Sequence, residues 1–288
     1  MNSEQPSVSA QVKSGIARKW TYAVLALAFL FVLMPFLFWQ ATWFGKPLTD
    51  EEVAKDLADR EHPRKTQHAL AQIADRIIRG DPSVQRWYPH VVALARHSAD
   101  EIRVTAAWVL GQDNTVPAFH EALLLLQKDG NPMVRRNAAL SLVRFADSAG
   151  RAELVAMLEP YALSSPHAGV LKQRLKPDDI VNPGTLLGRV VAPASRPASS
   201  SEEHEIRSSV PGRVERWLSG DGARIVSGQP IVLLAPSEEM VWEALRALYL
   251  VGEPEDLSAV ERYTRPLSDF SPRIQQQALL TAARLRRE

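Results

Sequence analysis

The chain has no cysteine, which excludes disulfide bonds and thiolate metal sites. It also has almost no net charge, because 34 basic and 33 acidic side chains leave a balance of +1 at pH 7. A nucleic-acid-binding domain normally carries a basic face, so this balance argues against a nucleic-acid partner. The redox compartment stays open, since a chain without cysteine is compatible with either one.

The common signatures of catalysis and metal binding are missing as well. The sequence has no Gly-x-Ser-x-Gly elbow, P-loop, dinucleotide fingerprint or His-Glu-x-x-His pair. Its seven histidines are scattered, and exposed helix histidines explain them better than a metal site does. A β-turn explains the stretch Gly220-Asp221-Gly222. We therefore predict no enzyme activity, no catalytic residue, no metal site and no cofactor.

Charged residues are absent from 20–45, where the chain is mostly aliphatic and aromatic. As a helix this stretch would extend about 39 Å, enough to cross a bilayer with some tilt. Trp20 and Trp39 stand where interfacial aromatic residues are expected. The alternative is a cleaved signal peptide, whose apolar region is shorter and ends in small residues. The sequence favours an uncleaved transmembrane anchor at 20–45.

The distribution of basic residues predicts the orientation of this anchor. Lys13, Arg18 and Lys19 precede it, whereas Lys46 alone follows closely before the acidic stretch 50–52. The positive-inside rule then places the tail 1–19 in the cytoplasm and the rest of the chain outside. In a bacterium this describes a single-pass inner-membrane protein with periplasmic C-terminal domains.

Amphipathic helical patterns dominate the segment 46–160. Thr49 and Glu52 form a capping box at its start. The patterns predict helices at about 50–59, 63–79, 84–97, 100–112, 116–128, 131–146 and 150–159. Asp-Pro and Gly-Asn-Pro signals separate several of them.

Two of these helices repeat one motif. Ile102-Arg103-Val104-Thr105-Ala106-Ala107 matches Val134-Arg135-Arg136-Asn137-Ala138-Ala139 at a shift of 32 residues. Both resemble the inner helix of a HEAT repeat, in which small alanines allow close helix packing. The resemblance implies a short α-solenoid in which Arg103 and Arg135 link adjacent repeats. An ordinary helical bundle with a coincidental match is the alternative.

A second repeat lies between 161 and 236. At a constant shift of 44 residues, matched positions are Ser164, Ser165, Val170, Val181, Gly184 and Leu187 with Ser208, Ser209, Val214, Ile225, Gly228 and Ile231. Two short β-rich halves of one pattern predict a pseudo-two-fold β module, because neither half alone buries its apolar face.

The second half, Val210-Pro211-Gly212-Arg213-Val214 followed by 220–231, resembles the barrel-sandwich hybrid of biotinyl domains, lipoyl domains and membrane-fusion adaptors. The carriers of this fold hold their cofactor on a lysine between the two halves. Here the connection 188–207 has no lysine, nor has any position after Lys176, so covalent biotin or lipoate is excluded. Its prolines and serines predict a flexible loop where the adaptors have a helical hairpin.

The final segment, 237–288, returns to helical patterns. Ser237 is a helix N-cap, a second helix is expected at about 255–264, and the stretch from Ser271 again resembles a HEAT inner helix. There Ile274 takes the position of Val134. We therefore expect 237–288 to pack on 100–160, with the β module inserted into or docked onto one solenoid.

The patterns predict a mainly α fold with a β module and one transmembrane helix, and the resemblances imply that the helices form a HEAT-like solenoid and the β module a barrel-sandwich hybrid. The function that they favour is a non-catalytic periplasmic scaffold or adaptor, as in a transport or efflux assembly. A factor for complex assembly or cofactor insertion, or a HEAT-like lyase, is the alternative. The candidate partner surface comprises Arg103, Arg135, Arg136 and Trp217, although the core is the favoured place for Trp217. Homo-oligomerisation stays open.

Overall fold

The computed structural model describes residues 22, 24–36, 47–59, 61–192 and 203–287. The chain divides into two compact units, with the boundary between Val53 and Ala54. The first unit contains a helix over 24–36, and its apolar side chains, such as Leu27 and Phe31, are exposed by 68% and 81%. Among the described residues, no helix is both long and apolar enough to cross a membrane. Both ends of the predicted anchor, 20–21 and 37–45, lie outside the described residues.

The capping box predicted at the start of α2 (Asp50–Leu57) is confirmed. The backbone N–H of Thr49 donates to Oε2 of Glu52 at 2.8 Å, and the N–H of Glu52 donates back to Oγ1 of Thr49 at 3.3 Å. Two N–H groups that have no partner within the helix are thereby satisfied.

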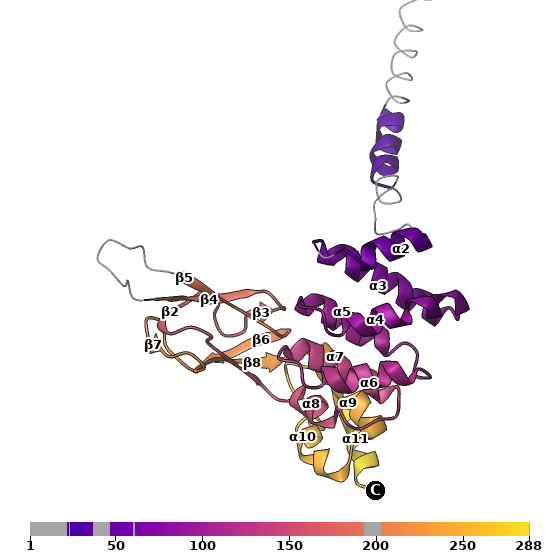
Figure 1. Cartoon of the computed structure of the whole chain (residues 1–288). Helices are drawn as coiled ribbons and strands as arrows, with labels where there is room; N and C mark the ends of the chain where they lie inside the picture. The colour runs from indigo at the N-terminus through magenta and orange to yellow at the C-terminus, as the bar shows by residue number, and fades with distance from the viewer. Residues whose placement is uncertain (1–21, 23, 37–46, 60, 193–202, 288) are drawn as a thin grey trace, which may run out of the picture. The chain divides into compact units, whose positions relative to one another are not determined.

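The second unit begins with α2's last turn and continues through helices that match the predicted positions closely (Figure 1). Their bounds are α3 Pro63–Ile78, η1 Pro82–Trp87, α4 Tyr88–Leu94, α5 Asp100–Leu110, α6 Pro117–Leu126, α7 Pro132–Val143 and α8 Arg151–Ala156. After the strands follow α9 Glu238–Val251, η2 Pro254–Asp256, α10 Leu257–Glu261 and α11 Pro272–Leu285. Several start with proline, whose missing N–H costs nothing in the first helical turn.

Helices α3, α5, α7, α9 and α11 form one continuous row, and each packs on the next. Two buried hydroxyl groups make equivalent hydrogen bonds between neighbouring helices of this row. Ser141 Oγ in α7 donates to the carbonyl of Ala107 in α5 at 2.8 Å, and Thr281 Oγ1 in α11 donates to the carbonyl of Leu245 in α9 at 2.9 Å. Ser141 and Thr281 differ by the same 140 residues that separate Val134 from Ile274, so α11 repeats the packing of α7.

Helices α4, α6, α8 and α10 pair with α5, α7, α9 and α11, respectively. The pair α8–α9 is interrupted by all eight strands, so the β module is inserted between the two helices of one pair. One core joins both sides of the insertion: Leu154, Met157 and Leu158 are buried with residues of α9, α10 and α11. The predicted contact between 237–288 and 100–160 is confirmed.

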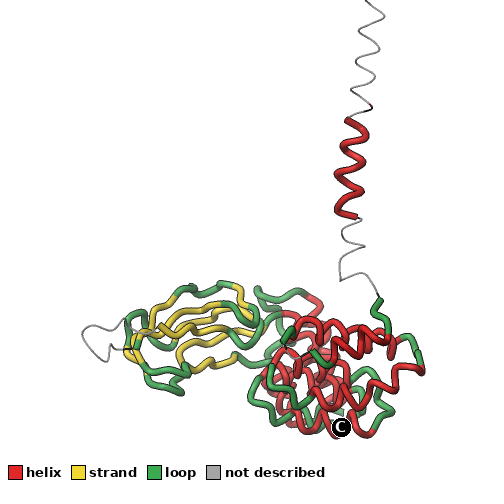
Figure 2. Tube along the Cα trace, turned by 45° about the horizontal axis from the view of Figure 1, so that its top comes forward, coloured by secondary structure: helices red, strands yellow, loops and turns green. Residues whose placement is uncertain are grey.

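Figure 2 shows the strands gathered in one region of the second unit and the helices in another. The strands are β1 Tyr161–Ser164, β2 Gly169–Gln173, β3 Ile180–Val181, β4 Leu186–Val191, β5 Glu203–Arg207, β6 Gly212–Trp217, β7 Arg224–Ile225 and β8 Pro230–Pro236. They form two antiparallel four-stranded sheets, in the orders β1-β8-β6-β3 and β5-β4-β2-β7. Their inner faces share a core that includes Leu171, Leu187, Val214 and Ile231.

The two sheets are related by an internal pseudo-symmetry. Replacing β1, β2, β3 and β4 by β5, β6, β7 and β8, and the reverse, converts the order of one sheet into that of the other. Each sheet therefore contains two strands from each half, and neither half can form a sheet pair alone. This arrangement explains why the sequence repeat appears as two short, incomplete β units.

The register of the internal repeat differs from the sequence prediction at its start. Ser165 and Ser208, which are 43 residues apart, make the same contacts: each Oγ donates to the carbonyl two residues later, at 2.7 and 2.6 Å. Val170 likewise corresponds to Arg213, so the pairing of Val170 with Val214 is wrong. The shift becomes 44 only after an irregularity between Val214 and Arg216, which inserts one residue into β6.

Strands occupy both ends of the connection predicted as a loop at 188–207. Strand β4 continues to Val191, and β5 begins at Glu203 and pairs with β4. The remaining residues of this connection, 193–202, lie outside the described part of the chain.

Candidate protein-binding surface

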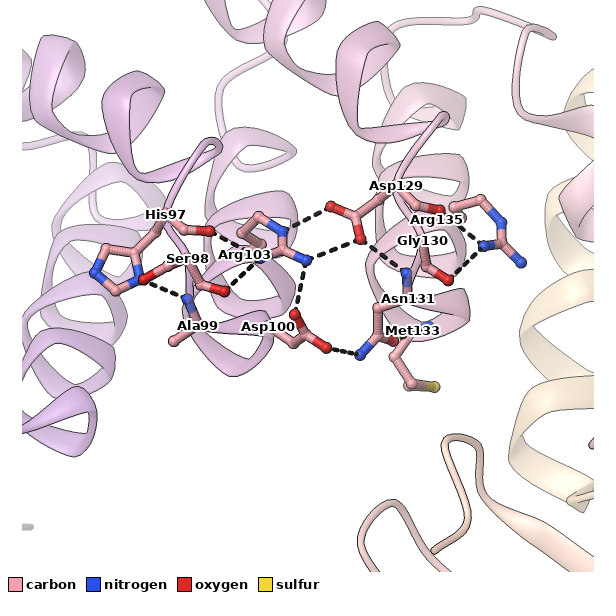
Figure 3. Close-up of polar contacts among 10 residues, drawn as sticks. All are labelled: His97, Ser98, Ala99, Asp100, Arg103, Asp129, Gly130, Asn131, Met133 and Arg135. Atoms are coloured by element: carbon pink, nitrogen blue, oxygen red, sulfur yellow. Dashed lines mark hydrogen bonds and ion pairs between the residues drawn. The ribbon is translucent and has the colours of Figure 1, made fainter. Parts of the chain in front are cut away.

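The linking arginine predicted at Arg103 in α5 uses its whole guanidinium group within the chain (Figure 3). Nε and Nη2 donate to the two carboxylate oxygens of Asp129 at 2.6 and 3.0 Å. Nη1 donates to the carbonyls of His97 and Ser98 at 2.8 and 3.0 Å. Asp129 lies in the loop between α6 and α7, so one side chain ties three segments together.

Asp100 and Asn131 close this arrangement into a ring (Figure 3). Arg103 Nη2 donates to Oδ1 of Asp100 at 2.7 Å, and Asn131 Nδ2 donates to Oδ2 of the same carboxylate at 2.9 Å. The backbone N–H of Asn131 then donates to Oδ1 of Asp129 at 2.8 Å. Asn131 also caps α7 by accepting from the N–H of Met133, so the ring fixes where α7 begins.

The hydrogen bonds of the ring shift the pKa values of Arg103 and Asp129. The hydrogen bonds from Arg103 to Asp129 raise the pKa of the guanidinium. Burial alone would raise the pKa of Asp129, but the hydrogen bonds from Arg103 and from the N–H of Asn131 outweigh it and lower that pKa. The side chains are only 16% and 10% exposed, so solvent screens this pair weakly.

Arg135 in α7 repeats the pattern of Arg103 one helical pair later. Nη1 donates to the carbonyls of Asp129 and Gly130 at 2.8 and 3.2 Å, and Nε donates to Glu153 in α8 at 2.8 Å. These two carbonyls lie 32 residues after those that Arg103 contacts. The linking role implied by the HEAT resemblance is therefore seen at both arginines.

Arg136 differs from its neighbour because its side chain is only 5% exposed. Its Nε lies 3.4 Å from Oε1 of Glu153, and its guanidinium carbon lies 5.6 Å from the ring centroid of Tyr161 in β1. Burial lowers the pKa of Arg136, while the charge of Glu153 opposes that effect. Arg136 thus stands at the junction between the helices and the β module.

Trp217, at the end of β6, is part of the β module and does not join the arginines. Its ring packs against the core between the sheets, and its Nε1–H donates to the carbonyl of Leu175 at 3.0 Å. The half-buried ring has the packing of a core residue, which was the favoured reading of Trp217. The docking role of the face bearing Arg103, Arg135 and Arg136 stays a prediction.

The carboxylates that complete this network, Asp100, Asp129 and Glu153, were not among the predicted site residues. A signal for one of them exists, because Asp129 directly precedes the Gly-Asn-Pro sequence that separates α6 from α7. In the described ranges, no group of three or more histidine or acidic side chains is arranged to hold a metal ion.

Comparison with known families gives one match. Residues 88–174 match the family model described as HEAT repeats, a stretch that includes α4 to α8 and ends just after β2. The HEAT-repeat interpretation of the helices is thus supported over less than half of the chain, and repeats of this kind commonly mediate protein interactions. No curated protein matches the chain.

Proposed function

We propose that this protein is a non-catalytic, membrane-anchored scaffold that uses a HEAT-like solenoid to bind protein partners. The observation that carries the proposal is the continuous row α3-α5-α7-α9-α11, which remains intact although a β module is inserted between α8 and α9. A solenoid offers an extended surface to other proteins, and an inserted module adds a second one.

In this proposal the β module is a barrel-sandwich hybrid, and two observations support that assignment. Its strands from two equivalent halves interlock in two sheets, and the residues between the halves offer no lysine for a covalent cofactor. The module therefore serves as a docking or assembly unit, as in membrane-fusion adaptors, in place of a carrier.

The membrane anchor in this proposal rests on the helix over 24–36. Nine large apolar side chains of this helix are exposed by more than half, and an exposed helix that is apolar all round needs an apolar environment. The basic residues before it support an orientation in which the second unit lies outside the cytoplasm, in the periplasm of a bacterium.

Two experiments test this function. Alkaline extraction of membranes should leave the native chain in the membrane fraction, whereas Leu27→Arg with Phe31→Arg should release it, because each arginine costs about 2.5–3.5 kcal/mol at the centre of a bilayer. Mild crosslinking in detergent, affinity purification and mass spectrometry should then recover an integral membrane complex, such as a transporter permease. A native chain recovered as a lone monomer would refute the scaffold function.

A further inference from the structure

A shallow apolar groove lies between the outer helices α4 and α6 and has a volume of about 270 Å³. The lining residues take positions i, i+3, i+4 and i+7 on each side: Pro89, Val92 and Ala93 of α4 with Arg96 just after it, and Ala118, Glu121, Ala122 and Leu125 of α6. Such a stripe is the pattern with which one helix packs against another. Three alanines keep the walls low, and Leu125 is 43% exposed beside them.

The two walls of the groove run in the same direction. Short loops connect α4 to α5 and α5 to α6, so consecutive helices are antiparallel and α4 is parallel to α6. Contacts at the N-terminal ends agree, since the rings of Tyr88 and Phe119 lie 4.6 Å apart. Tyr88 also donates to Oδ2 of Asp113 at 2.7 Å, which ties the start of α4 to the loop before α6. The groove therefore has a fixed width and a defined polarity.

One charge stands on each wall without a partner. Arg96 follows the last turn of α4, and Glu121 lies in the middle of α6. Neither side chain forms a hydrogen bond or an ion pair with any part of the chain that the structure describes. Elsewhere on these repeats the arginines Arg103 and Arg135 are bonded within the chain. Unpaired opposite charges beside an apolar groove specify the charges of what binds there.

We propose that this groove binds an amphipathic helix of a partner protein. The partner helix lays an apolar face between α4 and α6, and it carries an acidic residue opposite Arg96 and a basic residue opposite Glu121, on the two edges of that face. It runs antiparallel to α4 and α6, because that direction aligns its dipole favourably with theirs. The acidic residue then precedes the basic one by about one turn. This inference rests on the proposed scaffold function and names the partner class.

The direct test uses two stapled helical peptides and the full-length protein in detergent, with binding measured by fluorescence anisotropy. The matched peptide has the apolar face and charge order given above, and the second peptide has its glutamate and lysine exchanged. The matched peptide should bind about tenfold more tightly, since two solvent-exposed ion pairs are made in one case and two repulsions in the other. The double variant Arg96→Glu, Glu121→Arg should reverse this preference. Equal binding of both peptides, or no binding of either, overturns the proposal.

A second measurement uses the natural partners and separates this inference from the scaffold function. Ala93→Trp fills the groove from an exposed wall position, and Ala152→Trp on α8 is a matched exposed control. In crosslinked pull-downs, the first variant should lose a partner that the native chain and the control retain, and the crosslinked peptide of that partner should be the predicted helix. If Ala93→Trp keeps every partner, the groove proposal fails while the scaffold stands. If the native chain recovers none, the scaffold fails and the peptides decide the groove.

Discussion

Replacement of Arg103 by alanine should destabilise the solenoid more than replacement of Arg135 or Arg144. The side chain donates five hydrogen bonds, to Asp129, Asp100 and two carbonyls. Removing one partner of a buried ion pair costs about 3–5 kcal/mol, because the remaining charge keeps its desolvation cost. Asp129 is 10% exposed and retains the N–H of Asn131, so we expect a loss near the lower end, about 3 kcal/mol.

Two further substitutions make this prediction quantitative. Arg135→Ala should cost less, about 2 kcal/mol, because Arg135 makes three hydrogen bonds and is 27% exposed. Arg144→Ala is the control: this exposed arginine at the end of α7 has one hydrogen bond, to Gln112, and should cost less than about 0.5 kcal/mol.

The assay is urea unfolding followed by far-UV circular dichroism, with hydrogen exchange used to locate the change, because repeat proteins do not always unfold in one step. Exchange should accelerate first in the loop that contains Asp129. A double-mutant cycle of Arg103→Ala and Asp129→Ala should give a coupling energy above about 1.5 kcal/mol. A loss no larger than that of Arg144→Ala, or a coupling near zero, would refute the structural role of the ring.

Three further predictions concern other joints of the fold. Gly111→Ala should lower the unfolding free energy by about 1–3 kcal/mol in the same assay, because its Cβ would lie 2.4 Å from Oγ of Ser141. Arg213 in β6 donates to the exposed Asp269 at 2.5 Å, so Arg213→Glu should lower the unfolding free energy by less than about 1 kcal/mol. Adding Asp269→Arg should restore part of that loss. A double variant without any recovery would contradict this pairing. The pKa of Asp129 is lower in the folded state than its ordinary value of 3.8, so its stabilising effect is complete above that pH and is lost as the pH falls through the folded value. Unfolding titrations at acidic pH should therefore show a flatter decline in Asp129→Asn than in the native chain.

Local pattern was sufficient to predict most of the helices. The repeated pairs Ile102-Arg103 and Val134-Arg135, each followed by two alanines, predicted α5 and α7, because small residues at this spacing allow the close packing of solenoid helices. The helix α9 was predicted from its N-cap Ser237, but the repeat signal could not assign it to the inner row, because Val241 stands at the position of the linking arginine. Its place in the inner row is set by packing on α7 and α11, which no local pattern records.

Long-range contacts account for what the sequence could not predict in the candidate surface. Arg136 directly follows Arg135 in α7, and the local sequence does not show which of the two is buried. Strand β1 brings Tyr161 against Arg136 and leaves its side chain 5% exposed. The one-residue change in the internal β repeat has a similar origin. The irregularity after Val214 depends on how β6 pairs with β8, so a constant shift in sequence misaligned the first strands of each half.

The insertion of the β module has a consequence for how such a chain can change. Its first and last strands, β1 and β8, are hydrogen-bonded neighbours in which Tyr161 faces Leu234. The polypeptide therefore leaves α8 and returns to α9 through two points separated by about 5 Å, the spacing of adjacent strands. In a chain without the β module, a short turn could connect α8 to α9 across the same distance. Recombination at these two points could therefore remove the β module or replace it with another domain without changing the distance between α8 and α9.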